Sequence, residues 1–112
     1  ETRTAVSCCG VEATPKEPAE VRDGVARMAA VFKALSDETR LRILRSLLRS
    51  ERPLCECELV PSFGLSQSTI SYHLKVLREA GLVDVDRRGV WGYYRVEPRT
   101  LLGVVRHLTE MA

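Results

Sequence analysis

The chain of 112 residues is poor in aromatic side chains, which make up 5% of it, and it contains no long apolar run. No stretch approaches the ~20 apolar residues of a membrane span. The first residues lack the apolar core of a secretory signal, so we expect no membrane partner and a cytoplasmic location. The length fits one compact domain, and no internal repeat or low-complexity tract divides the sequence.

Motifs of several enzyme classes are also missing. The chain has no Cys-x-x-Cys pair, no phosphate-cradling loop and no alternation of strands with helices. These absences argue against a small thiol enzyme such as a disulfide reductase. We therefore expect no enzymatic activity and no organic cofactor. The formal net charge is only +2, with the basic excess in residues 41–112, which is compatible with a nucleic-acid partner.

Helical periodicity is present in several segments, and apolar residues recur at a helical spacing over 24–35. A second helix follows, with Ser36 or Asp37 as its N-cap, and ends at the "SERP" of residues 50–53. Pro98 opens a final helix over 98–111. Residues 1–23 have no periodic pattern and are interpreted as a flexible arm.

Two short helices joined by a turn lie in the middle of the chain. The pattern predicts one helix over 55–63, a turn at Gly64, and a longer helix from Ser66 to Ala80. This arrangement is typical of a helix-turn-helix. Two β-rich runs around a basic turn then predict a hairpin over 83–96.

The longer helix has a face suited to a DNA groove. Ile70, Leu74 and Leu77 form its predicted buried stripe, which leaves amide, hydroxyl and ammonium groups outside. Residues near the start of such a helix point most directly at bases. His73 is interpreted as a packing or phosphate-contact residue rather than a metal ligand. The predicted DNA contacts are Gln67, Ser68, Thr69, Ser71, Tyr72, His73, Lys75, Arg87 and Arg88.

Three stretches together resemble a known family. "FKALSDETRLRILRSLL", "LCECELVPSFGLSQSTISYHLKVLREAGLV" and "RRGVWGYYRV" are similar to the ArsR/SmtB family of metal-sensing winged-helix repressors. The resemblance implies a mainly α fold with a β-hairpin, a winged helix-turn-helix domain over 24–112. It also implies a homodimer that binds a twofold-symmetric operator in double-stranded DNA and leaves it when an inducer binds. Helices 24–35 and 98–111 would then form the dimer interface.

All four cysteines occur in two pairs, Cys8 with Cys9 and Cys55 with Cys57. In the cytoplasm such pairs are typical of metal or redox sites. Adjacent residues have Cα atoms about 3.8 Å apart, which is short for a disulfide. Cys55 and Cys57 begin a helix, where the dipole lowers the pKa of a thiol. If both were fully helical, their side chains at positions i and i+2 would point to different sides, so we expect one of the two to be the better ligand. We choose Cys55, near the N-cap and free to turn outward.

The number of thiolates predicts which type of ion binds. Cys8, Cys9 and Cys55 would form a three-thiolate site, which suits As(III) or Sb(III) as the inducer. A fourth thiolate from Cys57 would instead favour Zn(II) or Cd(II). The part of the arm between Cys9 and the first predicted helix is ~14 residues long and reaches about 20 Å, enough to cross to a second subunit. A Cd/Pb/Zn-responsive repressor and a thiol redox-sensing repressor remain the alternatives.

The family resemblance supports the metalloid interpretation in part. The stretch "LCECEL" resembles the arsenic-sensing box of the family, in which Cys55 and Cys57 match the first two cysteines. The usual third cysteine is Val60 here, so the arm would have to supply the missing thiolate. The family's other site, on the C-terminal helices, is matched only in its second half, by His107 and Glu110. We expect no zinc there.

Overall fold

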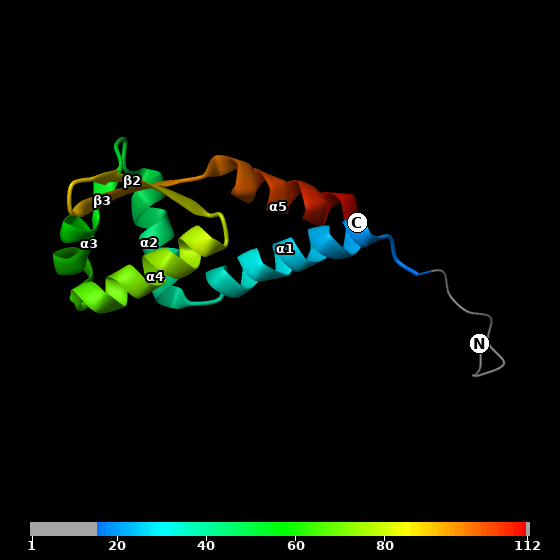
Figure 1. The fold of residues 1–112 in the computed structure, drawn as a ribbon, viewed down its shortest axis with the longest axis horizontal. Helices are drawn as coiled ribbons and strands as arrows, with labels where there is room; N and C mark the ends of the chain where they lie inside the picture. Colours follow the sequence, from blue (N-terminus) through cyan, green and yellow to red (C-terminus); the bar gives the residue numbers. More distant parts are fainter. Residues whose placement is uncertain (1–15, 112) are drawn as a thin grey trace.

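The computed structural model describes residues 16–111 as a mostly helical chain with a small antiparallel sheet (Figure 1). The predicted winged helix-turn-helix is confirmed: α3 and α4 are joined by a tight turn, and the β2–β3 hairpin follows them. In order, the elements are α1 (Ala19–Leu35), α2 (Glu38–Arg49), β1 (Leu54–Cys55), α3 (Glu56–Phe63), α4 (Gln67–Glu79), β2 (Val83–Arg88), β3 (Trp91–Val96) and α5 (Pro98–Met111).

The core lies where α2, α3, α4 and the end of α1 meet the hairpin. The predicted stripe of α4 is confirmed, because Ile70, Leu74 and Leu77 have no exposed surface. Ile43 of α2 and Leu82, just before β2, are equally buried and belong to the same cluster. Burial of several branched aliphatic side chains in one cluster is the main favourable contribution to folding here.

Local signals fix the helix ends. The Asp37 carboxylate accepts a hydrogen bond from the Arg40 backbone N–H at 3.0 Å, and this bond lowers the pKa of Asp37. At α4 the Ser66 hydroxyl accepts from the Thr69 backbone N–H at 3.2 Å. Gly64 ends α3 with a φ of 64°, a left-handed conformation that glycine adopts at low cost. The predicted caps and the turn at Gly64 are therefore confirmed.

The first helix differs from the prediction at its start. α1 begins at Ala19, before the predicted start at Gly24, so the last part of the expected arm is helical. Pro18 stands at the N-cap and Glu20 lies in the first turn, where an acidic side chain favours the helix dipole. Cys8 and Cys9 lie outside the described residues.

The sheet has one strand more than expected. β3 pairs with β2 in the predicted hairpin and on its other edge with β1, in the order β1-β3-β2. Leu54 lies opposite Tyr94, and Cys55 lies opposite Tyr93. A strand of two residues shows no periodicity, so the sequence gives no sign of it. The pairing holds the start of α3 against the hairpin.

The helices α1 and α5 project from the rest of the molecule in the same direction (Figure 1). α5 has an apolar side, yet none of its residues is buried. Exposed apolar side chains on the two helices are Val21, Val25, Phe32, Leu102, Val105, Leu108 and Met111. Among residues 16–111, no helix combines the length and the apolarity that a membrane crossing needs.

Candidate nucleic-acid interface and thiol pair

The outer face of α4 presents polar side chains to solvent, as predicted. Gln67, Ser68 and Lys75 are exposed, and so is the large ring of Tyr72. Ser71 is half-buried. Thr69 is half-buried too and accepts a hydrogen bond from the Ser66 hydroxyl at 2.9 Å, so its hydroxyl is partly engaged in the helix cap. The contacts of these residues with DNA stay predictions.

His73 lies on the inner edge of α4 rather than on its outer face. Only 13% of its side chain is exposed. Its Nδ1 is 3.2 Å from Arg40 Nη1 and 4.0 Å from the Asp37 carboxylate. The ring thus packs α4 against the start of α2, which agrees with the packing interpretation.

The hairpin carries two arginines with different partners. Arg87 Nη1 is 3.6 Å from the Glu56 carboxylate, whereas Arg88 donates to Asp86 at 3.2 Å and stacks over the Tyr93 ring at 4.7 Å. Both guanidinium groups remain more than half exposed. They are therefore free to approach a phosphate backbone, although each would exchange an existing carboxylate contact for it.

A polar cleft with a volume of 360 Å³ lies between α4 and the hairpin. Lys75, Arg78 and Arg87 line it together with one carboxylate, that of Glu56. The phenol of Tyr94 is buried beside them, and this burial, with the charge of Glu56, raises its pKa. The cationic excess makes the cleft complementary to an anion such as a phosphodiester.

Glu56 is the site residue that the sequence did not single out. It is only 7% exposed, although it lies in the first turn of an amphipathic helix, where acidic residues usually face water. Its carboxylate accepts from Gln67 Nε2 at 3.0 Å and from the Ser71 hydroxyl. Its position between the two cysteines is the only sequence feature that could have drawn attention to it.

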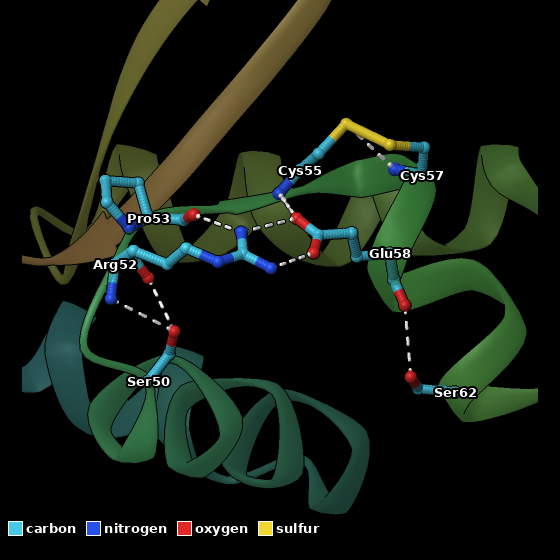
Figure 2. Close-up of polar contacts among 7 residues, drawn as sticks. All are labelled: Ser50, Arg52, Pro53, Cys55, Cys57, Glu58 and Ser62. Atoms are coloured by element: carbon cyan, nitrogen blue, oxygen red, sulfur yellow. Dashed lines mark hydrogen bonds and ion pairs between the residues drawn. A yellow bond between two sulfur atoms is a disulfide. The ribbon is translucent and has the colours of Figure 1, made fainter.

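Cys55 and Cys57 lie together, with a disulfide between them and 5.1 Å between their Cα atoms (Figure 2). They do not point to different sides, because the condition for that is not met and Cys55 is not helical. It is the extended N-cap of α3, with a ψ of 148°, and its sulfur accepts from the Cys57 backbone N–H at 3.2 Å. A side chain in this position folds back over the first turn.

The two cysteines differ in solvent exposure. Cys55 is only 2% exposed, so the expectation that it turns outward was wrong, whereas Cys57 is exposed. The pairing of β1 with β3 buries Cys55 against the sheet, a contact that the local sequence does not reveal. When reduced, the pair would offer two sulfur donors to one soft ion from adjoining positions.

A second carboxylate of the same turn, that of Glu58, lies beside Arg52 and the backbone of Cys55 (Figure 2). Glu58 accepts from the Cys55 backbone N–H at 2.9 Å and from Arg52 Nη1 at 3.1 Å. The guanidinium of Arg52, followed by the Cys55 backbone N–H, lowers the pKa of Glu58 to about 2. These contacts tie the start of α3 to Arg52, just before β1.

A complete metal centre is not formed by the described residues alone. Within 16–111 no group of three His, Cys, Asp or Glu side chains is placed to hold one ion. A three-thiolate site at Cys55 therefore needs a donor from beyond this range, which is where Cys8 and Cys9 lie.

Comparisons with known proteins agree on one family. Residues 37–85 match the family described as "Bacterial regulatory protein, arsR family". The chain is 50% identical over 68 residues to the arsenic resistance transcriptional regulator ArsR1 of Pseudomonas putida, covering 61% of this chain but only 52% of that regulator. It is 38% identical over 74 residues to the arsenical resistance operon repressor of Bacillus subtilis, covering 66% of this chain and 70% of the relative.

A solved structure shows the same architecture. The homodimeric winged helix-turn-helix DNA-binding domain of a possible ArsR-family regulator from Mycobacterium bovis superposes with a TM-score of 0.67 at 27% identity. The match covers 87% of this chain and 90% of that domain.

Proposed function

Because the chain belongs to the ArsR family of bacterial regulatory proteins, a family of DNA-binding transcriptional regulators and not of enzymes, we propose that it is a metalloid-responsive repressor. In this proposal a homodimer binds a twofold-symmetric operator in double-stranded DNA within the cytoplasm. As(III) or Sb(III) then binds cysteine thiolates and releases the protein from the operator. The observation that carries the proposal is the thiol pair at the first turn of α3, within the helix-turn-helix itself.

The apolar surface of α1 and α5 supports the homodimer. Leu102, Val105 and Met111 are each more than half exposed on α5, and exposed apolar side chains gathered on one helix favour association. A second copy related by a twofold axis would cover it with the same surface. The related domain from Mycobacterium bovis is described as homodimeric.

The polar face of α4 supports the DNA contacts. Gln67 and Ser68 lie in its first turn, where recognition helices meet base edges, and Lys75 can neutralise a phosphate. Arg87 and Arg88 on the hairpin would follow the phosphate backbone beside the helix. Substitution of Gln67 should therefore alter which DNA sequences the protein prefers. Substitution of Arg88 should instead weaken binding to all DNA sequences by about the same factor.

The cysteines support the proposal that As(III) or Sb(III) is the inducer. Two sulfurs held together give a soft ion two of the three thiolates that As(III) prefers, and Cys8 or Cys9 would supply the third. The arsenical resistance repressor of Bacillus subtilis and the arsenic resistance regulator of Pseudomonas putida are relatives of this chain. An exposed Cys57 beside a buried Cys55 suggests that the ion meets Cys57 first.

The test is release of the reduced, full-length protein from DNA, measured by fluorescence anisotropy. The duplex is selected from a random-sequence pool by the protein itself, and arsenite, cadmium and zinc are titrated separately. We expect release by arsenite, loss of this release in Cys55→Ala, and weakening in a Cys8→Ser/Cys9→Ser double variant. Unchanged arsenite release in Cys55→Ala would overturn the proposal, and release by cadmium or zinc alone would make the protein a divalent-metal sensor.

A second candidate trigger is thiol oxidation, which the disulfide between Cys55 and Cys57 favours. Hydrogen peroxide would take two electrons and two protons from the dithiol, leaving one disulfide and two molecules of water. In the same assay such a repressor would leave DNA when peroxide is added and return when a reductant is added. It would not respond to arsenite under reducing conditions.

A further inference from the structure

The carboxylate of Glu56 connects the thiol pair to the predicted DNA-contacting surface. Oε2 accepts hydrogen bonds from Gln67 and Ser71 on α4, and Oε1 faces Arg87 of the hairpin. These three partners come from the two elements that would meet DNA. One buried side chain thus sets the positions of several side chains that are predicted to contact DNA.

Because Glu56 is buried, these contacts strongly affect the free energy of the surface arrangement. A carboxylate that is 7% exposed has lost most of its water, so its hydrogen bonds and its ion pair replace hydration. Moving it away from its partners would leave a poorly hydrated charge, and Gln67, Ser71 and Arg87 would change their side-chain positions. The group therefore favours one arrangement of the surface over others.

The backbone of Glu56 is held on both sides by the cysteines. Cys55 is the N-cap of α3 and pairs with Tyr93 of the sheet, and Cys57 follows in the first turn. Their side chains meet across this single residue. A change in the distance or direction between the two sulfurs must alter the backbone that carries Glu56.

We propose that Glu56 is the positioning residue that transmits the state of the Cys55–Cys57 thiols to the DNA-contacting surface. This inference rests on the proposed function, whose release mechanism it specifies. The structure shows the carboxylate in contact with Gln67, Ser71 and Arg87 while the two sulfurs are joined. In the proposal it keeps these partners when the thiols are free, and this arrangement binds DNA. An ion that draws the sulfurs toward itself turns the first turn of α3, and the carboxylate leaves these partners.

Glu58 provides a matched control in the same helical turn. Its carboxylate contacts Arg52 and the Cys55 backbone N–H, and no hydrogen bond or ion pair joins it to α4 or the hairpin within residues 16–111. Glu58→Gln removes the same charge as Glu56→Gln, and its amide oxygen still accepts at the cap. Only Glu56→Gln disturbs the link to α4.

The experiment compares the wild type, Glu56→Gln and Glu58→Gln as full-length, reduced proteins. Two quantities are measured: arsenite bound per chain by ultrafiltration, and the ratio of DNA affinities without and with arsenite, using the selected duplex. We expect all three proteins to bind arsenite alike. We expect the affinity ratio to fall about tenfold or more in Glu56→Gln and to stay unchanged in Glu58→Gln. A purely structural role would change DNA affinity with and without arsenite by the same factor.

Each outcome has a defined meaning. A wild-type ratio in Glu56→Gln overturns the inference and leaves the proposed function in place. If the wild type responds to cadmium and not to arsenite, the proposed inducer is wrong, and the inference is judged by the cadmium ratio. If the wild type responds to neither ion, both proposals fail. Ser71→Ala tests the same link from α4, and its ratio should fall in the same direction even if Glu56→Gln folds poorly.

Discussion

The two ends of the molecule use amphipathic helices in opposite ways (Figure 1). At the reading end, which comprises α2, α3, α4 and the hairpin, α4 buries Ile70, Leu74 and Leu77 completely. At the projecting end, formed by α1 and α5, the apolar side of α5 buries none of its residues. The reading end, together with Val31 and Ala34 at the inner end of α1, completes its core within one chain. The outer part of the projecting end carries apolar surface that a second chain would cover in the proposed dimer.

The largest expected effect is at the projecting end. Leu108→Glu places a charge on the apolar side of α5. Burying this carboxylate in a dimer interface, where no opposite charge pairs with it, is unfavourable. We expect the dimer to dissociate and the DNA affinity to fall by about 100-fold or more, because the two half-sites are then bound independently. Sedimentation equilibrium and anisotropy measure the two effects. Leu108→Met is the control, and a dimeric Leu108→Glu variant that binds DNA normally would contradict the proposed interface.

The same substitution at the two ends sharpens the contrast. Leu74→Ala removes a fully buried side chain of α4, so we expect the free energy of unfolding to fall by about 2–5 kcal/mol. Leu102→Ala changes an exposed side chain of α5. In dilute monomer, we expect a change within about 0.5 kcal/mol. Urea denaturation of both variants measures this difference, and equal losses would show that Leu102 is packed within its own chain.

A smaller effect is expected from the N-terminal cap of α4. Ser66→Ala removes the hydroxyl that accepts from the Thr69 backbone N–H, which should lower the free energy of unfolding by about 1 kcal/mol. Ser66→Asp retains an acceptor and should restore most of this loss in urea denaturation. If alanine and aspartate behave alike, the hydroxyl does not stabilise α4.

The smallest expected effect concerns Glu58 and depends on pH. Its pKa is lowered from 4.5 to about 2 in the folded protein, so its contribution to stability is present above pH 4.5 and is lost as the pH falls through about 2. Because the ion pair with Arg52 is largely exposed, we expect less than about 1 kcal/mol. The Tm difference between the wild type and Glu58→Gln should therefore shrink between pH 4.5 and pH 2. A difference that is constant over this range would mean that the charge of Glu58 does not contribute.

Local patterns were enough to predict most of the fold. The stripe of α4, the caps at Asp37 and Ser66, and the turn at Gly64 all follow from spacing and side-chain chemistry within a few residues. The hairpin could be predicted equally well, because its β-rich runs flank a basic turn. The start of α1 was missed because residues 19–23 carry too few apolar side chains to show a periodicity.

Contacts between distant segments limited the prediction of the candidate site. The short strand β1 forms only because β3 lies beside it, and this pairing buries Cys55. Likewise Glu56 is buried because α4 and the hairpin converge on it from later in the chain. The spacing of the cysteines was enough to single out the thiol pair as a candidate site, but its geometry and its link to α4 could not be predicted.

The most direct measurement is arsenic X-ray absorption spectroscopy of the full-length, reduced protein loaded with arsenite. We predict that three sulfur atoms surround the arsenic in the wild type, and that both Cys55→Ser and the Cys8→Ser/Cys9→Ser variant lose sulfur ligands. Retention of all three sulfur ligands in Cys55→Ser, or an arsenic surrounded by oxygen alone in the wild type, would contradict the proposal that the first turn of α3 binds the inducer.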